Sequence, residues 1–351
     1  MRKFLIGAGL NILRVSRAHK LAQPFTRGIG AVLMFHHVRP FAPATRGYAP
    51  NRLLEITPAF FEAVIVKVRA LGFEIVTLDE AVARIKQAGQ GAKVQRFAAL
   101  TFDDGYRDNR DFALPILRQH AAPFTVFVTT GFAGHTARLW WLELEEAVRR
   151  ASRMAPGPGM ADLECSTPVQ KTRMFNQLYW TLRAMPEEKA MARIAALAAA
   201  QGIAPLSFAR TLCMDWDELR EFVRDPLCAI GAHTMTHPRL ALRSAAKAED
   251  EMRASRYIIK QKLGSEPRHF AYPVGDPTSA GPRDFALARS LGFASAVTTR
   301  PGMIFAAHAA HLTALPRVSV NGNWQDVGYI DALLSGAPFA LWNKGRRVNV
   351  D

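Results

Sequence analysis

Short apolar runs alternate with longer segments of helical periodicity over most of this 351-residue chain. The apolar runs predict buried strands at residues 31–35, 74–78, 97–102, 124–129, 228–230, 269–272, 294–297 and 317–320. The periodic segments predict helices at residues 58–71, 79–86, 108–120, 244–263, 282–291 and 325–334. Repeated strand–helix units of this kind indicate an α/β fold with a parallel sheet, closed or open.

The rhythm changes between about residues 131 and 229, where several segments in succession have helical periodicity. They predict a helical insertion, with helices at residues 140–148, 169–185 and 187–201 and a further one that begins at the capping box of Asp215 and Glu218. Without the insertion, roughly 250 residues remain, which is a usual size for a barrel. We therefore predict a barrel over residues 31–340, a basic amphipathic segment at 1–30 and a basic tail at 341–351.

Positive charge is concentrated at the front of the chain. The net charge is +15, and nine lysines and arginines precede the first acidic residue, Glu55. Such a segment favours an anionic partner, for example a membrane surface, although a solvated basic face explains the charge equally well. The apolar run at residues 4–13 is too short to span a bilayer and has no clear cleavage site after it. An amphipathic helix, packed on the body or lying on a membrane, fits this pattern.

Other compositional features narrow the choice of partner and compartment. Cys165, Cys213 and Cys228 are widely spaced, which argues against a disulfide scaffold and favours a reducing compartment. We expect a cytoplasmic protein with possible peripheral membrane contact through the basic N-terminus, and we expect secretion less. No nucleic-acid-binding motif accompanies the charge, so no nucleic-acid partner is expected.

Two acids and two histidines carry the candidate chemistry. Asp103 and Asp104 follow the predicted strand at 97–102, and His233 and His237 follow a second predicted strand with three residues between them. One carboxylate and two imidazoles can hold a divalent metal with an open position, as catalytic sites require. The other carboxylate can take a proton from a metal-activated water. Asp103 and Asp104 could divide the duties of ligand and base.

A third element is the strand end Phe270-Ala-Tyr-Pro-Val-Gly275. Its proline and glycine force a turn, and such a turn exposes backbone N–H groups that can steady an oxyanion. With this turn, the sequence offers a base, a metal site and an oxyanion donor.

These motifs resemble those of the polysaccharide deacetylases, the NodB-homology domains of carbohydrate esterase family 4. The resemblance rests on four elements in the family's order: Leu-Met-Phe-His36-His-Val, Thr-Phe-Asp103-Asp104-Gly-Tyr, His233-Thr-Met-Thr-His237-Pro and Phe-Ala-Tyr-Pro-Val-Gly. It implies an irregular (β/α)7-type barrel with the helical insertion. It also implies Asp103 as general base, and Asp104, His233 and His237 as ligands of a divalent metal, typically zinc.

The sequence departs from the family pattern in its third and last motifs. Ala271 stands where many members carry an arginine that orients the catalytic acid, and Val274 stands where an aromatic residue is usual. The Val274 N–H can still serve as oxyanion donor, with Tyr272 and Pro273 beside it as substrate contacts. The general acid is expected at His36, by resemblance to members whose first strand ends in Tyr-His.

Three further histidines are weaker candidates for the general acid. His37 follows His36 directly, and His311 and His308 lie near the place where many members carry a late Leu-x-His. We place His37 and His311 behind His36 for this role.

The expected activity is hydrolysis of the N-acetyl group in N-acetylglucosamine-containing oligo- or polysaccharides, as in chitooligosaccharide deacetylases. An O-acetyl esterase acting on exopolysaccharide would use the same site. A non-catalytic glycan-binding module on the same fold is the alternative from another class, because the third motif lacks the arginine and the aromatic residue.

Overall fold

Seven parallel strands form a closed barrel. The computed structural model describes residues 2–41 and 47–350. The barrel strands are β1 (Gly30–Phe35), β5 (Phe97–Phe102), β6 (Phe124–Val128), β9 (Cys228–Ala232), β10 (His269–Ala271), β11 (Ser295–Pro301) and β12 (Leu315–Ser319). They neighbour one another in the order β1-β12-β11-β10-β9-β6-β5, and β5 pairs with β1 over its whole length, which closes the barrel. Every residue of β1, β5 and β6 is buried, as expected for parallel strands covered on both faces.

Shorter strands add to this barrel. β4 (Glu74–Val76) pairs in parallel with the first half of β5. β2 (His37–Val38) follows β1 directly and forms a separate parallel pair with β3 (Glu55–Ile56). The predicted strand at 74–78 is therefore present but shorter, because Thr77 caps the following helix through a hydrogen bond from the N–H of Glu80.

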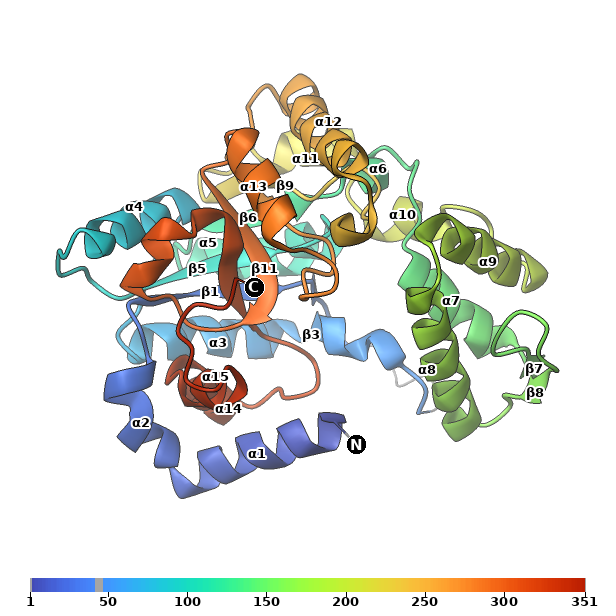
Figure 1. Cartoon of the computed structure of the whole chain (residues 1–351), viewed down its shortest axis with the longest axis horizontal. Helices are drawn as coiled ribbons and strands as arrows, with labels where there is room; N and C mark the ends of the chain where they lie inside the picture. The colour runs from blue at the N-terminus through green and yellow to red at the C-terminus, as the bar shows by residue number, and fades with distance from the viewer. Residues whose placement is uncertain (1, 42–46, 351) are drawn as a thin grey trace.

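Helices cover the outside of the barrel (Figure 1). They are α3 (Pro58–Ala70), α4 (Leu78–Gly89), α5 (Leu114–Gln119), α6 (Thr130–Ala133), α11 (Trp216–Phe222), α12 (Ala245–Leu263), α13 (Pro282–Ser290), α14 (Val327–Leu334) and α15 (Ala337–Trp342). The predicted helix at 108–120 is divided into a π-helical turn, Asn109–Ala113, and α5. Pro115 lies in the first turn of α5, and a proline is tolerated there because its missing N–H has no partner within the helix.

The helical insertion has a hydrophobic core of its own. It comprises α7 (Trp140–Arg150), β7 (Arg153–Met154), β8 (Leu163–Glu164), α8 (Pro168–Ala184), α9 (Glu187–Ala200) and α10 (Ser207–Leu212). Figure 1 shows these elements beside the barrel, in green, with α7, α8 and α9 packed against one another. Tyr48, which lies between β2 and β3 in the chain, also belongs to this core and packs among the apolar side chains of α7 and α8.

The insertion is narrower than residues 131–229. α6 lies at the end of β6, and α11 packs on the barrel, where Phe222 meets the ring of Phe124 with centroids 5.7 Å apart. Both ends of the expected range thus belong to the barrel. Helical periodicity shows that a helix has an apolar face, but it does not show which core that face meets.

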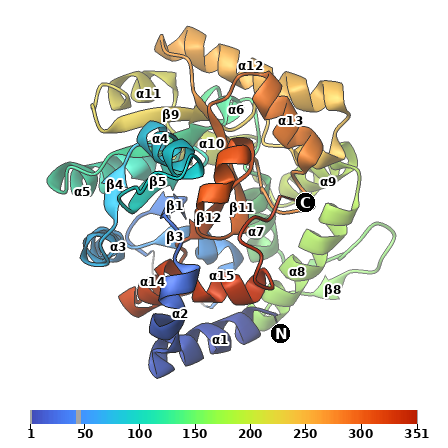
Figure 2. The same cartoon turned by 60° about the vertical axis from the view of Figure 1, so that its left-hand side comes forward.

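The N-terminal segment is helical and packs on the body. α1 (Arg2–Ser16) and α2 (Ala18–Thr26) lie against α14 and α15, near the end of the chain (Figure 2). Arg14 donates to the Asp326 carboxylate at 2.7 Å, and the Tyr329 hydroxyl bonds the Asn11 side chain at 2.7 Å. Within the described ranges, no helix combines the length and the apolarity needed to cross a membrane.

Candidate active site

Asp103 and Asp104 lie at the carboxyl end of β5 and point to different partners. The Asp103 N–H donates to the Phe35 carbonyl at 3.0 Å, so the register between β5 and β1 extends as far as this residue. Asp104 and Gly105 then both have positive φ, at 74° and 70°, and the chain turns sharply. Both carboxylates are almost completely buried. A buried acid needs a cation or several donors, so each must have a compensating partner.

The partner of Asp103 is Arg317, from the middle of β12. Both guanidinium NH2 groups donate to the Asp103 carboxylate, one to each oxygen, at 2.7 Å. Arg317 is itself buried and also donates to the Thr298 carbonyl at 2.8 Å. Burial alone would raise the pKa of Asp103, but the charge and hydrogen bonds of Arg317 hold this pKa below its usual range. Asp103 is therefore ionised and fixed in orientation.

Many family members carry an arginine at the position of Ala271, where it would orient this carboxylate. In the present structure Arg317 makes that contact instead. Ala271 is packed in the barrel core, and its carbonyl accepts a hydrogen bond from His233 Nδ1 at 2.7 Å. The sequence analysis missed Arg317. Its one local signal was a lone arginine inside the apolar strand Leu315-Pro-Arg-Val-Ser319, where burial of a cation implies a buried anion.

Asp104, His233 and His237 converge at one point. Asp104 Oδ1 lies 3.6 Å from His233 Nε2 and 3.4 Å from His237 Nε2. Within the described chain these three residues form a group that could hold a metal ion, since one ligand atom from each lies within 4.8 Å of the others. The His233 Nδ1–H donates to Ala271, so its Nε2 lone pair faces the group. The three residues that the sequence indicated as ligands are thus brought together.

The donor set fits a divalent metal. Asp104 Oδ1 is buried and finds no hydrogen-bond partner among the described residues. Burial, and then the charge of Asp103, raise the pKa of Asp104 well above its usual range. Burial lowers the pKa of His233 and of His237, so both imidazoles are neutral, as ligands must be. A cation would satisfy the buried oxygen and both nitrogens together.

The loop between the two histidines is held by side chains on both sides. Glu251 of α12 accepts from the N–H groups of Met235 and Thr236, at 2.8 and 2.9 Å. The rings of Trp141 and Phe132 pack against His237, with centroids 4.9 and 5.7 Å away. Residues that contact the ligands without binding the metal themselves hold those ligands in orientation.

His36 and His37, the neighbouring candidates for the general acid, have different surroundings. His36 Nε2 lies 3.9 Å from Asp103 Oδ2, and its side chain is partly exposed. Burial lowers the pKa of His36 to about 4. The buried His37 instead places Nδ1 at 2.5 Å from an Asp108 oxygen and stacks on Tyr106. Of the two, His36 is the one beside the Asp103 carboxylate.

The third motif, at residues 270–275, contributes Val274 to the site, whereas its other residues pack in the core or shape the turn. Val274 has a φ of 61°, an unusual value for a branched side chain, and lines the same narrow cavity as His237. The Val274 N–H finds no acceptor within the described chain. Tyr272 is fully buried and its hydroxyl donates to the Thr313 carbonyl, away from the ligands. The Pro273 carbonyl accepts from the Gly275 N–H at 2.6 Å and shapes the turn.

His311 and His308 lie at the other end of the barrel. They belong to the segment between β11 and β12, in which Ile304 pairs with Gly30, the first residue of β1. The site lies beyond Phe35, the last residue of that strand. The structure does not bring His311 to Asp103, because the segment reverses direction before β12 and packs on α4.

The fold and this site together define a class of protein. A closed (β/α) barrel presents a fixed carboxylate next to a possible metal site at the carboxyl ends of its strands, which is where barrel enzymes place their chemistry. An ionised acid beside a set of metal ligands is the arrangement of a metal-assisted hydrolase.

The chain belongs to the polysaccharide deacetylase family. The family model described as "Polysaccharide deacetylase" matches residues 90–295, which include Asp103, Asp104, His233 and His237. Members are hydrolases that act on carbon–nitrogen bonds other than peptide bonds, and this protein is one of them. Among curated proteins, no relative matches the chain.

Solved structures share the fold at low sequence identity. The deacetylase PplD of Streptococcus pyogenes, in complex with acetate, has a TM-score of 0.57 and 17% identity, covering 86% of this chain and 97% of its own. IcaB of Ammonifex degensii has a TM-score of 0.53 and 19% identity, covering 88% and 98%. A de-N-acetylase of Aggregatibacter actinomycetemcomitans has a TM-score of 0.53 and 13% identity, covering 86% and 99%. These likenesses establish the (β/α)7 fold.

Proposed function

We propose that the protein removes the acetyl group from N-acetylglucosamine units of an oligo- or polysaccharide, with Zn²⁺ as its cofactor. The observation that carries the proposal is the group of Asp104, His233 and His237 next to an Asp103 held by Arg317. Two imidazoles and a carboxylate with an open position are a usual donor set for catalytic zinc. Family membership supports an acetylated polysaccharide as the substrate.

In this mechanism a bound metal would polarise the acetyl carbonyl and lower the pKa of the attacking water. Asp103, ionised by its pairing with Arg317, accepts the proton of that water. The Val274 N–H donates to the oxyanion that develops on the acetyl group.

His36 delivers a proton to the leaving amine. Because the pKa of His36 is about 4, its imidazole is neutral at pH 7 before substrate binds. The proton therefore reaches His36 during the reaction, from Asp103, whose Oδ2 lies 3.9 Å away. This route keeps the proton within the pair from attack to departure of the amine.

The assay is acetate release from N-acetylglucosamine oligomers by the chelator-treated protein with and without added Zn²⁺. We expect activity only with metal, an activity loss of about 10²–10⁴-fold in Asp103→Asn and in His36→Ala, and unchanged zinc binding in His36→Ala. His237→Ala should lose zinc binding by calorimetry. Asp111→Asn is the matched control, because Asp111 is an exposed acid shortly after Asp103 in the chain. This variant should keep full activity.

Three results would overturn the proposal or one of its residue assignments. Release of acetate from O-acetylated but not N-acetylated saccharides would identify an O-acetyl esterase acting on exopolysaccharide. Full activity in Asp103→Asn would remove this residue from the role of base. Equal losses in His36→Ala and His311→Ala would contradict the choice of His36.

We also propose a cytoplasmic protein in peripheral contact with a membrane through its N-terminal helices. Leu21 and Phe25 lie one turn apart on α2 and are 82% and 75% exposed. Leu341 of α15 is 72% exposed, and α15 packs on α2. Exposed apolar side chains among basic ones, here Arg17 and Lys20, are typical of helices that lie on anionic lipid. The three free cysteines agree with a reducing compartment.

A further inference from the structure

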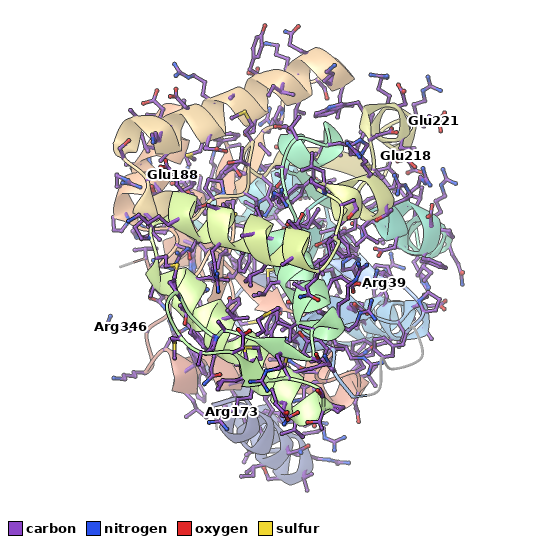
Figure 3. All side chains as sticks on the ribbon, turned by 90° about the vertical axis from the view of Figure 1, so that its right-hand side faces the viewer. Arg39, Arg173, Glu188, Glu218, Glu221 and Arg346 are labelled. Atoms are coloured by element: carbon purple, nitrogen blue, oxygen red, sulfur yellow. The ribbon has the colours of Figure 1, made fainter. Side chains whose placement is uncertain are left out.

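A cleft of about 840 Å³ separates the insertion from the barrel, next to the candidate active site. The junction of α8 and α9 forms one wall, and the segment from Arg239 to Lys247 forms the other. Figure 3 labels Glu188 on this side of the molecule, where α9 lies near the start of α12. A volume of this size accommodates a ligand as large as a short saccharide.

The cleft and the candidate site share lining residues. A narrower cavity beside it is lined by His237 and Val274 together with Arg183 and Arg239, and the latter two also line the large cleft. Arg239 is two residues beyond His237 in the chain. A glycan whose acetylated unit lies at His237 would therefore place its neighbouring unit at Arg239.

Arg239 differs from the other cations of the cleft. Arg183 pairs with Asp276 at 2.8 Å, Arg243 lies 3.5 Å from Glu188, and Lys247 lies 3.2 Å from Glu188. The half-buried Arg239 guanidinium has no acidic partner among the residues described, although its backbone N–H donates to Glu187. The Arg239 guanidinium is therefore left to pair with an anion that enters the cleft.

Trp180 supplies an apolar surface further along the same cleft. The side chain is 63% exposed, and the Arg183 guanidinium and the Tyr179 ring hold it from two sides, with centroid distances of 5.7 and 5.3 Å. An exposed, held indole presents a flat face on which the apolar face of a sugar ring can pack. Aromatic walls with a few placed polar groups are typical of ligand sites.

We propose that this cleft binds an anionic glycan, in which the unit next to the acetylated sugar carries a carboxylate or a phosphate that pairs with Arg239, while a further ring packs on Trp180. The inference rests on the proposed function, because it places the acetylated unit at the candidate metal site. Guanidinium groups match carboxylate and phosphate geometry, so Arg239 would recognise either group.

The test measures binding by calorimetry, without turnover, in the Asp103→Asn background of the full chain. The probes are a neutral N-acetylglucosamine oligomer, one of equal length that alternates with hexuronate, and one that bears phosphate. We expect at least about tenfold tighter binding of one or both anionic oligomers, a preference of the size that one charge-assisted pair gives. The stronger of the two identifies carboxylate or phosphate as the natural group.

Variants separate the cleft from general charge. Arg239→Gln should abolish the preference for the anionic oligomers, Arg239→Lys should keep part of it, and Trp180→Ala should weaken all three oligomers alike. Arg173→Gln is the matched control, since Arg173 is an exposed arginine of α8 outside the cleft (Figure 3). Equal affinity for neutral and anionic oligomers, or an equal loss in Arg173→Gln, would overturn the inference.

Because binding is measured apart from turnover, the two proposals fail separately. If anionic oligomers bind more tightly through Arg239 but no acetate is released, only the deacetylase reaction is refuted. Acetate release without that preference would refute only the anionic substrate.

Discussion

Asp103 depends on a buried ion pair with Arg317 for its charge and its orientation. Both partners are buried, and the pair is bidentate at 2.7 Å. Burial of two charges costs free energy even when they are paired, so such a pair contributes orientation more than net stability. Removal of one partner is different, because it leaves the other charge buried and uncompensated.

Arg317→Gln tests this dependence at the level of one residue. We expect a loss of about 3–5 kcal/mol in the free energy of unfolding, because Asp103 is left without a cation. Acetate release should also fall about 100-fold, since the base is no longer held in place. Urea unfolding of the single variant and of Asp103→Asn/Arg317→Gln is the decisive comparison. The double variant should be the more stable of the two, and equal stabilities would contradict an uncompensated charge.

Among the structural elements, α7 connects the insertion to the barrel through a carboxylate with a raised pKa. Glu145 of α7 accepts from the Asn51 side chain at 2.7 Å and from its N–H at 3.3 Å. Burial outweighs these hydrogen bonds and raises the pKa of Glu145 to about 7. Because the folded protein binds this proton more tightly than the unfolded chain, the stabilising contribution is present below the unfolded pKa near 4.5.

That contribution should be lost as the pH rises from about 4.5 to about 7. Relative to Glu145→Gln, the wild-type protein should lose on the order of 2 kcal/mol of stability between pH 5 and pH 8. Chemical unfolding of both proteins at each pH measures the difference. Relative to Glu146→Gln, by contrast, the wild-type protein should show no such loss, because hydrogen bonds from Arg149 and Arg150 outweigh burial and lower the pKa of Glu146. Parallel pH profiles of wild type and Glu145→Gln would show that Glu145 is not the group responsible.

For the whole molecule, the proposed membrane surface leaves the active site accessible. α2 leads into β1 at its first residue, whereas the candidate site lies beyond the last residues of β1, β5 and β9. Contact through α2 and α15 thus places lipid near the amino ends of the barrel strands. The catalytic end would remain free for a saccharide.

Sedimentation with lipid vesicles tests the proposed membrane surface on α2 and α15. We expect binding to vesicles that contain anionic phosphatidylglycerol, weaker binding to phosphatidylcholine alone, and a decrease at high salt. Leu21→Ser/Phe25→Ser should lower the partition by about tenfold or more, because two apolar side chains no longer insert. Val169→Ser, equally exposed on the insertion, should change nothing. Binding that is indifferent to lipid charge and to Leu21 and Phe25 would exclude this surface.

Much of the barrel could be predicted from the sequence, because its signals are local. An apolar run predicts a buried strand whichever neighbouring strand it pairs with in the fold. The run at residues 97–102 is a barrel strand with the bounds expected. The group of Asp104, His233 and His237, which could hold a metal, is also indicated by local signals, since all three residues lie in short motifs at strand ends. Residue types and spacing indicated a carboxylate with two histidines, whereas the choice of Asp104 over Asp103 came from the family resemblance.

Tertiary structure decided which residues meet across the barrel. Arg317 reaches Asp103 over 214 positions of sequence, and only closure of the barrel through β1 places β12 near β5. The same closure separates His311 from the site and leaves His36 beside Asp103. The insertion likewise forms a cleft between Trp180 and Arg239 that no local pattern contains. Sequence alone therefore determined the strands and the motifs that carry Asp104, His233 and His237, whereas the ion pair and the cleft depend on long-range packing, which local periodicity does not encode.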